Sequence, residues 1–125
     1  MKDEMLAHLH DIARSGKALK SFVAGRAFDH YISDEQLRSA VERKFEVMGE
    51  ALNRIRRDEP DILQRIRQHR DIISFRNILV HGYDAIDDQI VWSVIEDDLD
   101  NLLEDVAALL SEDQNRTTES NATSG

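Results

Sequence analysis

The feature that most constrains this fold is a helical spacing of apolar residues that recurs in two long segments. In residues 37–55 and again in residues 91–109, successive apolar side chains are separated by 4, 4, 3, 4 and 3 residues. This spacing places each set on one face of a long amphipathic helix. The two sets are Leu37, Val41, Phe45, Met48, Leu52 and Ile55, and Val91, Ile95, Leu99, Leu102, Val106 and Leu109.

Capping signals set the expected helix limits in the first half of the chain. The first helix is predicted from Asp3 to about Ala24, with Gly25 as its stop. The second is predicted to begin at Ser33, which can cap it in a capping box with Gln36. It should end near Asp58, because Pro60 disfavours helix in the residue before it and suits the first turn of the next helix.

The second half contains a third segment and a last helix. The third runs from Pro60 to about Val80, and the polar run 67–70 leaves open whether it is one helix or a short helix followed by a longer one. Gly82 is a natural stop after it. The last helix is expected from a cap near Asp87 to about Leu110.

These segments predict an all-α fold, an antiparallel bundle of four to five helices, which we expect to be homodimeric. The chain has 125 residues, one proline and five glycines, which fits one helical domain. We place that domain at residues 1–111. Residues 112–125 are polar and lack a hydrophobic period, so we expect a disordered tail there.

Composition excludes several classes of protein. The chain has no cysteine, so it has neither a disulfide framework nor a thiolate metal site. No apolar run is long enough to cross a bilayer, and the first residues lack the basic-then-apolar layout of a signal peptide. We therefore expect a cytoplasmic protein with no membrane partner. The histidines have no obvious co-ligands, so we expect no metal site and no cofactor.

The charge is unevenly distributed along the chain. The net charge of −9 argues at first against a nucleic acid partner, because phosphates repel an acidic surface. However, residues 1–37 carry a net charge of −1, residues 38–76 of +3 and residues 77–125 of −11. The basic middle segment could therefore face a polyanion while the acidic segment faces away from it, although mixed solvated helix faces would give the same counts.

The residues that can do chemistry gather at the end of the third segment, in the stretch from Arg76 to Tyr83. Cleaving a phosphodiester without a metal requires a proton to leave the attacking hydroxyl, a proton to reach the departing oxygen, and charge stabilisation at phosphorus. His81 can serve the proton steps and Arg76 can grip phosphate oxygens. Asn77 lies four residues before His81, on the same helix face. Arg76 lies about 140° from His81 around an ideal helix, so a two-fold dimer could help both to reach one phosphate.

The wider sequence resembles the HepT-type toxins of the HEPN superfamily over roughly residues 3–110. The resemblance is carried by Arg-Asn-x-Leu-Val-His-Gly-Tyr at residues 76–83, followed by Ile-Asp at 86–87 and Ile-Val-Trp at 90–92. The second helix is similar to that family in Val-Glu-Arg at 41–43 and Met-Gly-Glu-Ala at 48–51.

The resemblance implies a metal-independent endoribonuclease toxin that leaves 2′,3′-cyclic phosphate and 5′-hydroxyl ends. It implies a catalytic site of Arg76, Asn77 and His81, present in two copies near a dimer cleft. It also implies a cognate nucleotidyltransferase antitoxin of the minimal (MNT) type that adds AMP to Tyr83. Bulky anions beside a phosphate-binding site would obstruct RNA sterically and electrostatically.

Other interpretations stay open at this point. The chain could be a non-catalytic HEPN module that binds nucleotide or RNA, or serves as a scaffold, beside a nucleotidyltransferase, or it could be a purely structural dimerising bundle. His81 could simply cap a helix, and Arg76 could be a surface ion-pair partner of Asp71 or Asp84. A further hypothesis is that Glu50 supports Arg76 from a facing helix.

Overall fold

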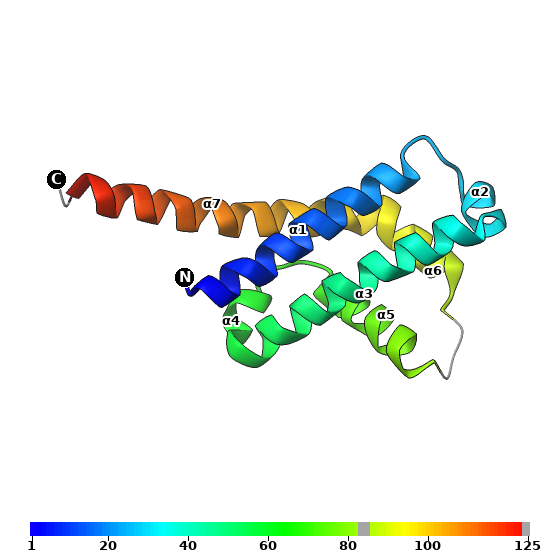
Figure 1. Cartoon of the computed structure of the whole chain (residues 1–125), viewed down its shortest axis with the longest axis horizontal. Helices are drawn as coiled ribbons and strands as arrows, with labels where there is room; N and C mark the ends of the chain where they lie inside the picture. Colours follow the sequence, from blue (N-terminus) through cyan, green and yellow to red (C-terminus); the bar gives the residue numbers. More distant parts are fainter. Residues whose placement is uncertain (83–85, 124–125) are drawn as a thin grey trace.

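The computed structural model describes residues 1–82 and 86–123, with side chains as far as residue 116, and in these ranges it contains helices and no strand (Figure 1). The all-α prediction is therefore confirmed for the described part of the chain. The helices are α1 Asp3–Val23, α2 Phe28–Ser33, α3 Glu35–Asp58, α4 Pro60–Leu63, α5 His69–His81, α6 Asp88–Ser93, a π-helical stretch Val94–Asp98, and α7 Leu99–Thr123.

The four longest helices form an antiparallel bundle, with α3 at its centre. Helix α3 packs against α1 on one side and against α5 on the other, and α7 packs against α1. Successive long helices run in opposite directions in Figure 1. Helix α5 is thus held mainly by α3, and the end of α5 that carries His81 lies at the edge of the bundle.

The core is built from the two apolar faces that the sequence predicted. All twelve of their residues are buried. Phe45 of α3 meets Phe75 of α5 edge-on, with ring centroids 5.4 Å apart. Tyr31 of α2 packs on Trp92 of α6 at 5.3 Å. Aromatic pairs in such tilted arrangements stabilise a core beyond the area they bury, so these contacts fix α5 on α3 and α6 on α2.

The start of α3 corrects the expected cap. The prediction that Ser33 begins and caps this helix was wrong, because Asp34 is the capping residue and its Oδ1 accepts a hydrogen bond from the Leu37 backbone N–H at 3.0 Å. Ser33 instead ends α2, and its hydroxyl donates to the carbonyl of His30 at 3.1 Å. Between the first two predicted helices lies α2, a short helix that the apolar spacing did not reveal.

The third predicted segment is two helices. Pro60 occupies the first turn of α4, as expected, and α5 begins at His69. Between them the backbone of Gln68 is left-handed, with φ of 67°, a conformation that costs energy in a residue other than glycine. This turn lets α5 leave α4 in a new direction.

The last predicted helix begins as expected and ends later. The Asp87 side chain caps it by accepting from the Gln89 backbone N–H at 2.9 Å. The helix was expected to end near Leu110, but α7 continues to Thr123, and Glu112 forms an ion pair with Arg65. The boundary between a domain of residues 1–111 and a tail of residues 112–125 stays a prediction. No helix among the described residues is long and apolar enough to span a membrane.

Candidate functional site

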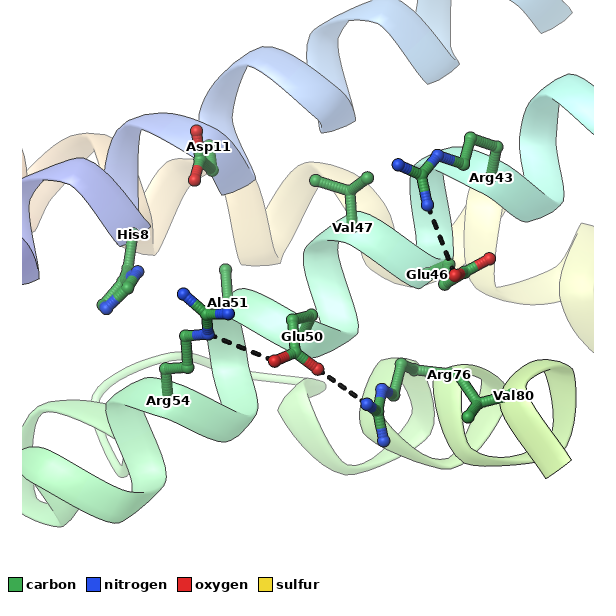
Figure 2. A pocket seen from close by; sticks show the side chains of 10 residues that line it. All are labelled: His8, Asp11, Arg43, Glu46, Val47, Glu50, Ala51, Arg54, Arg76 and Val80. Carbon is green, nitrogen blue, oxygen red and sulfur yellow. Dashed lines mark hydrogen bonds and ion pairs between the residues drawn. The ribbon is translucent and has the colours of Figure 1, made fainter.

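Arg76 lies where α5 crosses α3, and a carboxylate from α3 holds its guanidinium. Nη2 of Arg76 is 2.7 Å from Oε2 of Glu50. The other oxygen of the same carboxylate, Oε1, accepts from Nε of Arg54 at 3.1 Å. Figure 2 shows Glu50 between the two arginines. The alternative of a surface ion pair between Arg76 and Asp71 is not what the structure has, and Asp84 lies outside the described residues. The hypothesis that Glu50 supports Arg76 from a facing helix agrees with this geometry.

Gly49 allows this crossing. A Cβ atom on Gly49 would lie 2.3 Å from Cβ of Arg76 and 3.0 Å from the carbonyl oxygen of Ile72. The first of these atoms is attached directly to the backbone of α5 and the second is part of it, so neither can move unless α5 moves. A glycine at this position therefore lets α5 lie directly against α3 and brings Arg76 beside the neighbouring Glu50.

A cleft of about 380 Å³ opens on this side of α5, between α1, α3 and α5 (Figure 2). Each of its arginines has a carboxylate partner, since Arg43 pairs with Glu46 at 3.3 Å while Arg54 and Arg76 share Glu50. The cleft is thus rich in charge but locally balanced. It is lined by His8, Asp11, Arg43, Glu46, Val47, Glu50, Ala51, Arg54, Arg76 and Val80.

Asn77 lies on the neighbouring side of α5. Its Oδ1 accepts from Nη1 of Arg76 at 3.3 Å, which links the two predicted site residues directly. Asn77 also lines a second cleft, of about 460 Å³, between the end of α3, α4 and α5. Arg76 and Asn77 are therefore in contact but open onto two different clefts.

His81 is the last residue of α5 and is exposed to solvent. Gly82 ends the helix as predicted, with φ of 66° and its N–H donating to the carbonyl of Ile78 at 2.9 Å. His81 lies one turn beyond Asn77 on the same helix, but it lines neither of these two clefts. A single copy of the chain thus places the predicted catalytic residues Arg76, Asn77 and His81 on one short stretch of α5, but it does not enclose them in one pocket.

Two further predictions concern this region. Tyr83, the predicted modification site, lies outside the described residues. Among the residues that the structure describes, no group of three or more histidine and carboxylate side chains is arranged to hold a metal ion.

An all-helical bundle with an Arg-Asn-x3-His stretch ending one helix is the arrangement found here, and comparison with known proteins identifies its family. The sequence model of the family described as "Ribonuclease HepT-like" matches residues 12–109. The chain therefore belongs to the HepT-like ribonuclease family.

Individual relatives agree with this assignment. The chain is 28% identical over 105 residues to a "Probable ribonuclease HepT" of Thermococcus cleftensis, covering 82% of this chain and 92% of the relative. It is also 28% identical over 105 residues to a "Putative RNase" of Methanocaldococcus jannaschii, covering 84% and 95% of the two chains. No solved structure gave a significant match.

Sequence reasoning raised Glu50 as a support for Arg76 but missed Arg54 and Gly49, the other two residues that arrange this contact. Arg54 lies four residues after Glu50, which is the spacing of a helical ion pair and could have predicted that contact. Gly49 stands inside an amphipathic helix, where a glycine costs stability unless a close approach requires it. The presence of this glycine could therefore have predicted that another helix crosses closely at position 49.

The crossing yields a stability prediction. Gly49→Ala should lower the free energy of unfolding by about 1–3 kcal/mol, because the new methyl group forces α5 away from α3. Gly16→Ala is the matched control: both glycines are buried within helices, but a Cβ on Gly16 meets only the flexible end of the Leu103 side chain. Urea denaturation should show a clear loss for Gly49→Ala and a much smaller change for Gly16→Ala; equal effects would contradict the role assigned to Gly49.

Proposed function

We propose that this protein is the toxin of a toxin–antitoxin pair, an endoribonuclease that cuts RNA without a metal ion. In this reaction the ribose 2′-oxygen attacks the adjacent phosphorus, the bond to the 5′-oxygen breaks, and the products are a 2′,3′-cyclic phosphate and a 5′-hydroxyl. One proton leaves the 2′-hydroxyl and one joins the 5′-oxygen, so the reaction needs acid–base groups and a cation but no external reagent. Membership of the HepT-like ribonuclease family supports this proposal.

The single structural observation that carries the proposal is the fixed guanidinium of Arg76. Arginine binds phosphate oxygens through a planar fork, and its value to catalysis depends on its being held in place before the charge develops. The 2.7 Å contact with Glu50 and the close packing over Gly49 hold it.

The other two residues take the remaining roles. His81 takes and gives the protons, because imidazole changes charge near neutral pH. Its exposure at the end of α5 leaves it accessible to a long substrate. Asn77 lies beside Arg76 and one turn before His81, and it orients the substrate or the imidazole through its amide.

We further propose that the active form is a homodimer. Arg76 and His81 do not line a common cleft in one copy, and a two-fold axis would place two copies of each across one groove. Val80, an apolar residue that is 48% exposed, lies between them on α5.

The first prediction for this function concerns His81. His81→Ala should reduce RNA cleavage by about 100-fold or more, because proton transfer contributes at least that much to such reactions. Its melting temperature should stay near that of the unmodified protein, since the side chain is exposed. Cleavage of a labelled RNA by purified protein in excess chelator is the measurement.

Three outcomes of that experiment are informative. Cleavage that disappears on chelation would exclude the metal-free mechanism. Full activity in His81→Ala would remove His81 from its role. RNA binding without cleavage by the unmodified protein would favour the non-catalytic HEPN module instead.

A second prediction separates positioning from binding. Glu50→Gln should lower kcat by roughly tenfold or more, since a misplaced Arg76 no longer meets the developing charge. KM should stay constant or fall, because the change removes a negative charge from the cleft. Glu46→Gln is the matched control: Glu46 lines the same cleft on α3 with nearly equal exposure, but it pairs with Arg43. Equal kinetics in the two variants would refute the role of Glu50.

A third prediction concerns the antitoxin. Co-expression with a nucleotidyltransferase of the minimal type should increase the intact mass by one or more AMP units and abolish cleavage. Tyr83→Phe should prevent both changes. The chain has only one other tyrosine, Tyr31, which is fully buried in the core, so it should not accept AMP in the folded protein. An unchanged mass in the unmodified chain would contradict this form of regulation without bearing on cleavage.

A further inference from the structure

The second cleft, on the Asn77 side of α5, has a composition unlike that of the first. It has a volume of about 460 Å³, and it lies between three successive segments of the chain, the end of α3, α4 with the turn after it, and α5. Its polar groups are arginine, histidine, serine and amide side chains, and it contains no carboxylate. The lining residues are Arg56, Leu63, Gln64, His69, Arg70, Ile73, Ser74 and Asn77.

Among the residues that the structure describes, the two arginines of this cleft have no acidic partner. Nη2 of Arg56 donates to the amide oxygen of Asn53 at 2.8 Å, which leaves its charge uncompensated. In the described part of the chain, no carboxylate lies within ion-pair distance of Arg56 or Arg70 (contrast Arg43, Arg54 and Arg76 in the first cleft). The protein as a whole has a net charge of −9, so a cleft with two unpaired arginines differs in sign from the average surface. Such a cleft is suited to binding an external anion.

The start of α5 adds to the positive potential. His69 and Arg70 are its first residues, and no side chain caps the helix there. The free N–H groups of a first helical turn carry a partial positive charge. Nδ1 of His69 is buried without a hydrogen-bond partner. The pKa of His69 is lowered by burial and then by the charges of Arg70 and Arg56, so both arginines act on the same point in the cleft.

The acidic residue in this first turn faces elsewhere. Asp71 does not line the cleft. Its negative charge acts instead on Asp98, in the π-helical stretch. The pKa of Asp98 is raised by burial and by the charges of Asp71 and Asp97. Asp71 therefore faces the acidic side of the bundle and leaves the cleft cationic.

The cleft shares one residue, Asn77, with the proposed catalytic site. Asn77 belongs to both, because it lines the cleft and contacts Arg76. Arg70 precedes His81 by about 16 Å along the axis of an ideal helix. A strand that reaches from one to the other must be several nucleotides long, and Ser74 lies between them on the cleft side of α5.

We propose that this cleft is a binding subsite for the backbone of single-stranded RNA, in which Arg56 and Arg70 contact phosphates several nucleotides from the bond that is cut. This inference rests on the proposed function. Ser74 and Gln64 supply hydrogen bonds for ribose or base, and Leu63 and Ile73 supply an apolar floor. The substrate would then run along α5 from its uncapped start to His81. Such a track selects a strand over a mononucleotide, since only a strand reaches both ends.

The experiment measures binding separately from cleavage. The probe is a fluorescently labelled, unstructured single-stranded RNA, and the protein carries His81→Ala so that the RNA stays intact. Adding Arg56→Gln and Arg70→Gln should weaken binding by roughly tenfold or more at low salt. The slope of log affinity against log salt should become shallower by about 1.4, because each lost phosphate contact on a single strand contributes about 0.7.

The matched control removes two positive charges elsewhere. Arg14→Gln with Lys17→Gln, at exposed positions of α1 outside both clefts, should change the affinity by no more than about twofold at physiological salt, where exposed charges beyond about 8 Å are largely screened. Melting curves of both double variants confirm that each is folded.

Every outcome bears on the proposal. If Arg56→Gln with Arg70→Gln behaves like the control while the unmodified chain cuts RNA, the subsite is wrong and the ribonuclease stands. If the variant loses affinity but the unmodified chain never cuts RNA, the subsite stands and the proposed cleavage is wrong. Absence of RNA binding by the His81→Ala protein would overturn the subsite.

Discussion

The contact on which the rest of this site depends is the crossing of α3 and α5 at Gly49. Because Gly49 has no side chain, the backbone of α5 lies directly against α3, and Arg76 meets Glu50 at 2.7 Å. The edge-on pair of Phe45 and Phe75 holds the same two helices together. The apolar core thus fixes the helix that carries Arg76, Asn77 and His81, and a charged contact fixes the guanidinium within it.

Much of the fold follows from local patterns. The apolar spacing in residues 37–55 and 91–109 predicted two buried faces, and the buried set includes every one of those residues. Asp87 and Gly82 act at the helix ends as expected. Ser33 was wrongly preferred to Asp34 because either side chain can cap a helix, and only the path of the preceding chain, here the short helix α2, decides which of the two is placed to do so.

The candidate site could be predicted only in part. The order of residues 76–83 indicated which side chains to examine, and the 140° between Arg76 and His81 agrees with their facing different surroundings in one copy. The partners of Arg76 depend on a contact between helices, which no local spacing determines. The second cleft was not foreseen, because Arg56, Gln64 and His69 come from three segments that meet only in the folded chain.

Glu50, shared by two arginines, has a consequence for selectivity. In the proposed ribonuclease its carboxylate occupies an acceptor position that a phosphate oxygen would take, so it is an internal substitute for the proposed substrate. An incoming anion must exchange with this substitute or share the arginines with it. A monovalent ion such as chloride gains little from that exchange, whereas a nucleic acid strand presents many negative oxygens at once. In the proposed site, Glu50 would therefore favour a nucleic acid strand over small anions.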